Sequence, residues 1–275
     1  MSNWPRGLDR AHHETIGADT ATSLQTSVVS GATAETKGSW TQIAAATSFS
    51  YDGFWLNRRF VGTGSRRVVV DIGIGGSGAE QAIVSDFSMF VQTSATADEI
   101  LHIPVHVPAG SRVTMRTASD GTSIATRFSI LGMTAGWNQP YSFCRAQNVG
   151  LTGTQGTIVD AGGVANTKGS WVSIGGATTE QYDALMLCVN VSTYPTAQTA
   201  AADFLIDVAI GAGFDSILEN LHFSQSTNVN GGSPVHWGPF DIRMPAGTQV
   251  SARCQCTSAV ATVRAIQLSY LGFVS

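Results

Sequence analysis

The stretch Thr36-Lys37-Gly38-Ser39-Trp40 decides the architecture, because it returns unchanged as Thr167-Lys168-Gly169-Ser170-Trp171. The offset is 131 positions, the difference between Trp171 and Trp40. Further matches keep the same order, and their offsets grow in small steps, as loop insertions between retained strands produce. They pair Tyr51-Asp52 with Tyr182-Asp183, Asp71-Ile72-Gly73-Ile74-Gly75 with Asp207-Val208-Ala209-Ile210-Gly211, Pro108-Ala109-Gly110 with Pro245-Ala246-Gly247, and Phe128-Ser129-Ile130-Leu131-Gly132 with Leu268-Ser269-Tyr270-Leu271-Gly272. We therefore expect one module used twice, with Trp40 and Trp171 in equivalent positions.

Each module is predicted to consist of short strands. The stretch 54–60 shows the period of two that is typical of a half-buried strand. Its expected inward residues are Phe54, Leu56 and Phe60, and its expected outward residues are Trp55, Asn57 and Arg59. Arg58 interrupts the inward set, so it is expected either near a strand end or paired. The sequence Pro108-Ala109-Gly110 is typical of a tight hairpin turn, and residues 80–87 and 215–221 are the helix candidates.

We expect an all-β chain of two tandem antiparallel β-sandwich domains of jelly-roll type. Repeat 1 is assigned to residues 21–135 and repeat 2 to residues 136–275. Residues 1–20 precede them and carry Trp4, Pro5 and Arg6. A large indole in a segment without a core of its own indicates an attachment peptide, and the alternative is a flexible or edge segment.

Composition limits the class of partner. The 275 residues suffice for two domains, and charged residues make up only 12%, with a formal net charge of −4. This charge argues against a nucleic-acid binder, which needs a basic face. No apolar run is long enough to insert into a membrane. The first residues lack the apolar core of a signal peptide, so we expect synthesis in a cytoplasm and no ordinary secretion.

Metal, redox and cofactor chemistry are not expected. Cys254 and Cys256 stand two apart on an expected strand, so both face one side, and all four cysteines are predicted to be reduced thiols. The neighbouring His12 and His13 point in different directions on a strand or a helix, which is poor geometry for a metal. The remaining histidines alternate with apolar residues and are expected to face solvent or to bond to neighbours: His102, His106, His222 and His236.

Two patterns imitate enzyme motifs. Residues 73–78 fit the G-x-G-x-x-G pattern of dinucleotide-binding proteins, but that motif needs a βαβ unit and the surroundings predict hairpins. A glycosidase needs two carboxylates across a cleft. Asp71 and Asp207 are repeated, like Asp52 and Asp183, and a repeated acid is more simply structural. The unrepeated Asp98-Glu99 and Asp203 have no evident partner, so no catalytic residue is assigned.

The motifs that open, centre and close the module carry a resemblance. They are Lys37-Gly38-Ser39-Trp40, the stretch 71–81 and the stretch 108–113. They resemble fibre and spike proteins of tailed phages and of phage-like gene transfer agents, over residues 30–132 and 160–272. The resemblance implies an oligomeric virion component that assembles in the bacterial cytoplasm, lies on the virion surface and binds host surface polysaccharide. It carries over no catalytic residue, and it would make residues 1–20 the contact to other virion proteins.

Three functions remain open: a spike or fibre that binds host polysaccharide, a purely structural virion adaptor or decoration protein, and a polysaccharide-degrading enzyme. For the first function, sugar rings are expected to stack on exposed aromatic residues. Repeat 1 offers Trp55 with Asn57 and Arg59 on one side of a strand, and repeat 2 offers Tyr194 in an enlarged loop and His236-Trp237. Trp55 could instead be covered by the neighbouring repeat or another subunit. A homotrimer is expected rather than a dimer, because a small-residue surface packs at little desolvation cost and multiple weak sites gain avidity.

Overall fold

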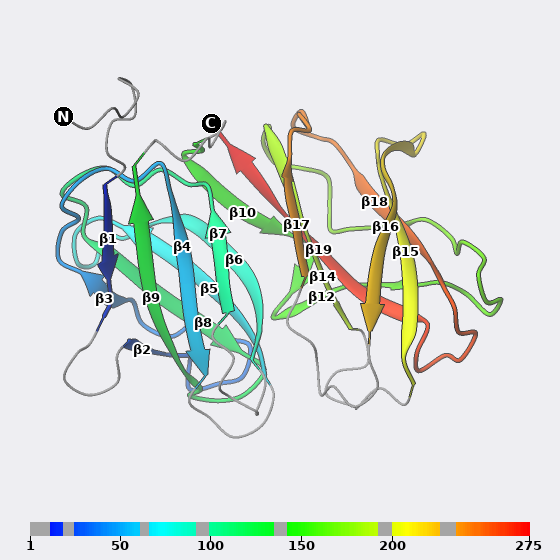
Figure 1. Ribbon diagram of the computed structural model, residues 1–275, viewed down its shortest axis with the longest axis horizontal. Coiled ribbons are helices and arrows are strands. Elements are labelled where there is room, and N and C mark those ends of the chain that lie inside the picture. Colours follow the sequence, from blue (N-terminus) through cyan, green and yellow to red (C-terminus); the bar gives the residue numbers. More distant parts are fainter. Residues whose placement is uncertain are drawn as a thin grey trace, which may run out of the picture.

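The computed structural model describes residues 12–18, 25–60, 66–91, 99–134, 142–191, 200–225 and 235–275. These residues form strands and turns, and no helix occurs among them. The described part of the chain accordingly holds no helix long and apolar enough to span a membrane. The all-β expectation is confirmed, with antiparallel sheets arranged as jelly-roll-like sandwiches (Figure 1).

Both helix candidates are wrong. Residues 80–87 fall largely within strand β6 (Gln81–Val91), and 215–221 within strand β16 (Asp215–Gln225). Each strand contains one residue with a left-handed backbone, Asp86 with a φ of 56° and Asn220 with a φ of 54°. The ladders to the neighbouring strands shift register nearby. Such bulges interrupt the period of two, so the sequence pattern no longer identifies a strand.

Repeat 1 is a sandwich of two sheets. Its front sheet runs β1 (His13–Ile16) and β2 (Thr26–Val29), then β9 (Ala125–Met133), β4 (Gly53–Phe60) and β7 (Glu99–Ile103). Its back sheet runs β3 (Thr41–Ala44), β8 (Val113–Ser119), β5 (Arg66–Ile74) and β6. The turn at 108–110 joins β7 to β8, which lie in different sheets. The expected hairpin is therefore wrong, although the turn itself is present, with Gly110 at a φ of 73°.

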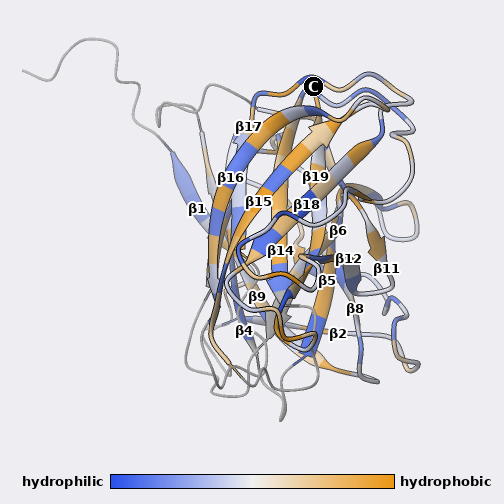
Figure 2. Ribbon diagram, turned by 90° about the vertical axis from the view of Figure 1, so that its right-hand side faces the viewer, coloured by the Kyte–Doolittle hydropathy of each residue, from blue (hydrophilic) through white to orange (hydrophobic). Residues whose placement is uncertain are grey.

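Repeat 2 uses the same topology. Its front sheet runs β10 (Arg145–Val149) and β12 (Gln155–Asp160), then β19 (Ala265–Val274), β14 (Ala184–Val191) and β17 (Val235–Phe240). The short β11 (Leu151–Thr152) pairs with β12. Its back sheet runs β13 (Val172–Ser173), β18 (Val250–Cys256), β15 (Ala202–Ile210) and β16. In Figure 2, hydrophobic and hydrophilic residues alternate along the strands of this repeat that face the viewer.

The repeated residues build the same buried network twice. In repeat 1, Lys37 Nζ lies 2.5 Å from Asp71 Oδ1, Arg116 Nε lies 2.7 Å from Asp71 Oδ2, and the Arg116 guanidinium lies 4.4 Å from the centre of the Trp40 ring. In repeat 2, Lys168 Nζ lies 2.6 Å from Asp207 Oδ1 and Arg253 Nε lies 2.9 Å from Asp207 Oδ2. The Arg253 guanidinium lies 4.6 Å from the centre of the Trp171 ring. The equivalence of Trp40 and Trp171 is confirmed, and Asp71 and Asp207 hold a loop, a strand and an indole together.

The sheet does not stop between the repeats. Strand β10 of repeat 2 pairs in parallel with β6 of repeat 1, with Ala146 opposite Val84 and Gln147 opposite Ser85. The back sheet of repeat 1 therefore continues into the front sheet of repeat 2, and Figure 1 shows β10 lying between the two repeats. The first hydrophobic core crosses this junction, because it contains residues of repeat 2: Phe143, Ala146, Ala184, Met186, Cys188, Leu271 and Phe273.

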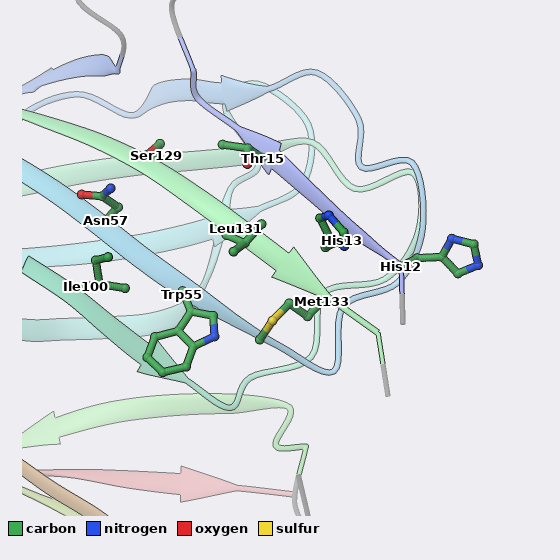
Figure 3. Close-up of a pocket in the computed structure, with 9 residues that line it drawn as sticks. All are labelled: His12, His13, Thr15, Trp55, Asn57, Ile100, Ser129, Leu131 and Met133. Atoms are coloured by element: carbon green, nitrogen blue, oxygen red, sulfur yellow. The ribbon is translucent and has the colours of Figure 1, made fainter. Parts of the chain in front are cut away.

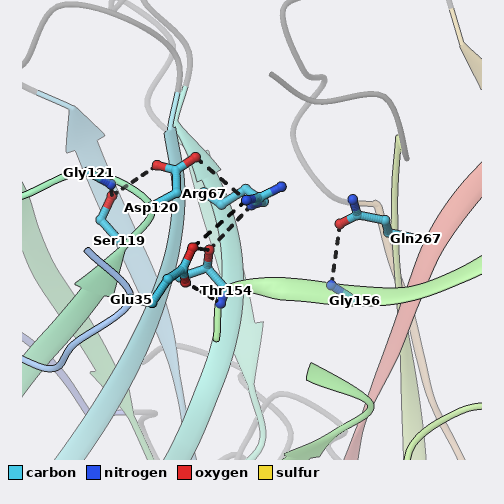
Figure 4. A network of polar contacts seen from close by, with 8 residues as sticks. All are labelled: Glu35, Arg67, Ser119, Asp120, Gly121, Thr154, Gly156 and Gln267. Atoms are coloured by element: carbon cyan, nitrogen blue, oxygen red, sulfur yellow. Dashed lines mark hydrogen bonds and ion pairs between the residues drawn. The ribbon is translucent and has the colours of Figure 1, made fainter. Parts of the chain in front are cut away.

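A polar clasp also joins the repeats (Figure 4). The Glu35 carboxylate of repeat 1 accepts hydrogen bonds from the Thr154 backbone N–H at 2.6 Å and from the Thr154 hydroxyl at 3.1 Å. Arg67 Nε donates to the same hydroxyl at 3.3 Å and lies 3.9 Å from Asp120. Thr154 is only 2% exposed, so its backbone donor depends on Glu35 for a partner.

Candidate functional site

A cavity of about 590 Å³ lies on the outer face of the front sheet of repeat 1. Figure 3 shows that β1, β4, β7 and β9 supply its walls. The lining residues are His12, His13, Thr15, Trp55, Asn57, Ile100, Ser129, Leu131 and Met133. Trp55 and Asn57 were expected on this face, and the structure brings both to one cavity.

The register of the sheet explains how these residues meet. Trp55 stands opposite Leu131 on β9, and Asn57 stands between Ser129 on β9 and Ile100 on β7. Side chains of directly opposed residues share a face of the sheet. The period of two within 54–60 identified the outward residues of β4. The residues on β1, β7 and β9 could be found only with the strand order and register, which a single sequence does not show.

Trp55 is half-buried and rests on a histidine. Its ring centre lies 4.9 Å from that of His102, the opposed residue on β7. Burial lowers the pKa of His102, so this ring is neutral at physiological pH. Its Nε2 is buried and has no hydrogen-bond partner among the described residues. His102 is partly exposed, and the expected bond to a neighbour is not formed through Nε2.

The polar groups of the cavity are one amide, two hydroxyl groups and the imidazoles of His12 and His13. Asn57 Oδ1 is shielded from solvent and has no hydrogen-bond partner in the described part of the chain. Ser129 Oγ accepts a hydrogen bond of 3.3 Å from Gln25, and Thr15 is exposed. Among the described residues, no Asp, Glu, Lys or Arg lines the cavity. Leu131, Met133 and Ile100 supply apolar surface, and Ile100 is 58% exposed. The cavity therefore suits a neutral ligand that has both apolar faces and hydrogen-bonding groups.

The other expected binding residues lie elsewhere. Arg59 is exposed on β4 but does not line the cavity. His236 stacks on Phe87 of repeat 1, with ring centres 4.9 Å apart, so it belongs to the junction between repeats. Trp237 is half-buried and meets Phe223 edge-on at 6.4 Å, against the second core. Tyr194 and the expected attachment residues Trp4, Pro5 and Arg6 lie outside the described residues.

The titratable groups outside the cavity have structural partners. Burial would raise the pKa of Asp71 and of Asp207, but the neighbouring ammonium and guanidinium groups, with a backbone N–H, hold both pKa values below the ordinary range. His106 lies 3.7 Å from Asp52, and His222 lies 3.5 Å from Asp203. In the described part of the chain, no three His, Cys, Asp or Glu residues gather as a metal site would require. Asp98 falls outside the described residues.

The cysteines are free thiols, as expected from their spacing. Cys254 and Cys256 face the second core, and Cys188 lies in the first core. Burial raises the pKa of the Cys188 and Cys254 thiols to about 12. These two groups are therefore protonated and unreactive at physiological pH.

No family model and no curated protein matches the chain. Among solved structures, it is similar to PNGF-II at 8% identity, with a TM-score of 0.41 over 96% of this chain and 64% of that chain. It is also similar to the CBM22-1-CBM22-2 tandem domain of Paenibacillus barcinonensis Xyn10C, at 10% identity and a TM-score of 0.26 over 96% of this chain and 91% of that chain. A third similar structure is that of infectious bursal disease virus Gt strain, at 12% identity and a TM-score of 0.29 over 97% of this chain and 43% of that chain. The chain thus spans about three fifths of the PNGF-II chain, and the function proposed below rests on its own geometry.

Proposed function

We propose that this chain is a spike or fibre protein on the surface of a phage-like particle, and that the cavity of repeat 1 binds a host surface polysaccharide. The observation that carries the proposal is Trp55, half-buried in an open cavity beside Asn57 and two hydroxyl side chains. The phage-like motifs of both repeats support the virion setting. In this proposal, residues 1–20 contact other virion proteins and the protein assembles as a homotrimer in the bacterial cytoplasm.

The chemistry of a sugar fits this cavity. A pyranose ring has C–H faces that pack on an aromatic plane, and its hydroxyl groups need donors and acceptors at the rim. The indole, with Leu131 and Met133, supplies the apolar surface, while Asn57 and Thr15 supply polar groups. Because no Asp, Glu, Lys or Arg occurs among the residues described as lining the cavity, we expect a neutral polysaccharide to bind better than a polyanionic one.

The test is binding of purified host capsule to the Trp55→Ala variant. A desolvated aromatic anchor contributes about 2 kcal/mol, so affinity should fall about 30-fold. Trp237→Ala is the matched control, because Trp237 is also half-buried but packs against the second core. It should lower the melting temperature and leave affinity unchanged. Unchanged binding by a folded Trp55→Ala variant would exclude this site.

A purely structural role in the virion is the second candidate. One observation favours it: in repeat 2, the face that corresponds to the cavity is buried against repeat 1. In either role we expect binding without cleavage, and this is supported by the repeated acids Asp71 and Asp207, each of which is engaged by the lysine of its own repeat. Release of reducing ends from capsule by the purified protein would contradict this and favour a polysaccharide-degrading enzyme.

A further inference from the structure

The outer face of the front sheet is buried in repeat 2 but lines a cavity in repeat 1. In repeat 2, the outer face of the front sheet is buried in the first core through Ala146, Met186, Cys188, Leu271 and Phe273. The matching positions follow from the pairing of β1 with β9 and of β10 with β19. Glu14 stands opposite Gly132, and Gln147 stands opposite Gly272, which is the counterpart of Gly132 in repeat 2. In repeat 1 these positions hold lining residues of the cavity: His13, Trp55, Asn57, Leu131 and Met133. The cavity face of repeat 1 therefore corresponds to a face that docks on protein.

In repeat 1, the buried face of repeat 2 meets the side formed by β6 and the chain after β7. Phe143 accepts a hydrogen bond from the His106 N–H at 2.7 Å and donates one to the Pro104 carbonyl at 2.9 Å. His236 stacks on Phe87, and its Nε2 lies 3.1 Å from the Ser88 carbonyl oxygen. With the β6–β10 pairing, these contacts close the open side of the first core.

The corresponding side of repeat 2 is apolar and only half covered. Four residues on this side of repeat 1 are fully buried: Val84, Phe87, Ile103 and Val105. Their counterparts in repeat 2 are all partly exposed: Leu218, Leu221, Phe240 and Ile242. Among the described residues, no strand pairs with the outer edge of β16. The described part of the chain thus presents the cavity face in one repeat and a partly exposed core edge in the other.

We infer that copies of this chain associate head to tail, with the β16 side of repeat 2 in one copy docking on the cavity face of repeat 1 in the next. The contact repeats the junction within the chain, so β1 adds in parallel to β16 as β10 adds to β6. A contact between two different surfaces closes into a ring if the rotation permits and otherwise extends into a filament. The occupant is a second copy, because both halves of the contact exist on this chain.

One pair of like charges, Glu14 and Glu219, would weaken the proposed contact between copies, so changing one of these charges tests it. By the register of β10 on β6, Glu14 of one copy stands beside Glu219 of the next, where the chain itself has Gln147 and Ser85. Like charges directly opposed across a ladder are destabilising. Glu219 is exposed, so Glu219→Gln removes the repulsion without disturbing the core. This variant should associate about threefold more tightly than the parent chain.

This inference goes beyond the proposed polysaccharide binding, because docking covers the cavity. In an open stack, one terminal copy keeps its cavity free for a sugar. Different variants test the head-to-tail association and the polysaccharide binding. Leu221→Lys changes the docking edge of repeat 2 and leaves the cavity intact, so the resulting monomer should bind at least as much capsule per chain as the associated parent does. Trp55→Ala removes the sugar platform.

The experiment is sedimentation of the full chain at rising concentration, to about 100 µM, which covers weak interfaces. We expect the mass to grow with concentration, and Ile100→Glu and Leu221→Lys to abolish this growth. Val164→Glu is the control, because Val164 is 66% exposed and belongs to neither surface. Melting curves verify that each variant folds. The tighter association expected for Glu219→Gln tests the inference even if Ile100→Glu or Leu221→Lys fails to fold. A monomer for both the parent and Glu219→Gln would overturn the inference, as would association that persists in folded Ile100→Glu and Leu221→Lys.

Discussion

The Asp71 and Asp207 carboxylates each anchor one repeat. Each accepts from a lysine, an arginine and a backbone N–H, which belongs to Asp86 in repeat 1 and Asn220 in repeat 2. Both side chains are about 5% exposed or less. The carboxylate therefore offsets two cations and fixes a bulge that would otherwise leave a donor unpaired.

We expect Asp71→Asn and Asp207→Asn to lower the free energy of unfolding by similar amounts, about 2 to 4 kcal/mol each, because either variant leaves two partly buried cations without their counter-charge. Urea denaturation of both variants checks this. Asp160→Asn is the control, because the Asp160 pair with Arg264 is exposed and should cost less than about 1 kcal/mol. Equal losses for all three variants would contradict the structural role.

The same carboxylates predict the response to acid. Their pKa values are lowered in the folded chain, so their contribution to stability is complete above the ordinary carboxyl pKa of about 3.9 and is lost as the pH falls through the lowered values. Denaturation measured from pH 7 to pH 2 should therefore show a steep loss below about pH 4. The double variant Asp71→Asn with Asp207→Asn should show a shallower loss. Identical slopes would argue that other groups control acid unfolding.

At the scale of the strands, two tyrosine rings each pack against a glycine of the neighbouring strand. A Cβ atom added at Gly132 of β9 would lie 2.3 Å from the Tyr51 ring, and one added at Gly272 of β19 would lie 2.5 Å from the Tyr182 ring. Both tyrosines are buried. The repeated Tyr-Asp and Leu-Gly matches of the sequence are thus two halves of one contact, in which the ring covers the glycine of the neighbouring strand.

Gly132→Ala and Gly272→Ala should each lower the melting temperature, because the new methyl group overlaps the ring and overpacking costs about 1 to 3 kcal/mol. Thermal unfolding followed by near-ultraviolet circular dichroism reports both stability and tyrosine packing. Gly76→Ala is the matched control, since nothing lies within 4 Å of an added Cβ there. A loss in the control as large as in the two strand variants would count against this contact.

The repeat pattern explains how much of the fold was accessible from sequence. Trp40 and Asp71 recur with their counterparts, so the module and the structural role of its repeated acids could be predicted, but the partners of those acids could not. The strands β6 and β16 could not, because Asp86 and Asn220 interrupt the alternation with left-handed backbone. For the cavity, alternation identified Trp55 and Asn57. It could not show that His236 meets Phe87, because that contact depends on which strand edges join.

At the scale of the molecule, the clasp between Glu35 and Thr154 should couple the repeats. Glu35→Ala leaves the buried Thr154 N–H without its acceptor, so we expect a loss of about 1 to 3 kcal/mol. A double-mutant cycle with Thr154→Val should give a coupling energy of about 1 kcal/mol. Asn166→Ala is the control, because Asn166 has the same left-handed backbone at the counterpart position, with a φ of 56° against 64° at Glu35. Zero coupling in the cycle would exclude the clasp.

The shared first core has a consequence for synthesis. Leu271 and Phe273 belong to that core, yet Gly272 between them follows its counterpart Gly132 by 140 residues. On the ribosome, the first core therefore stays incomplete until β19 has been translated. Exposed apolar surface of this kind attracts chaperones and invites aggregation. Slow translation between residues 135 and 265 should thus lower the yield of folded protein, since the half that leaves the ribosome first cannot complete its core before the second half is made.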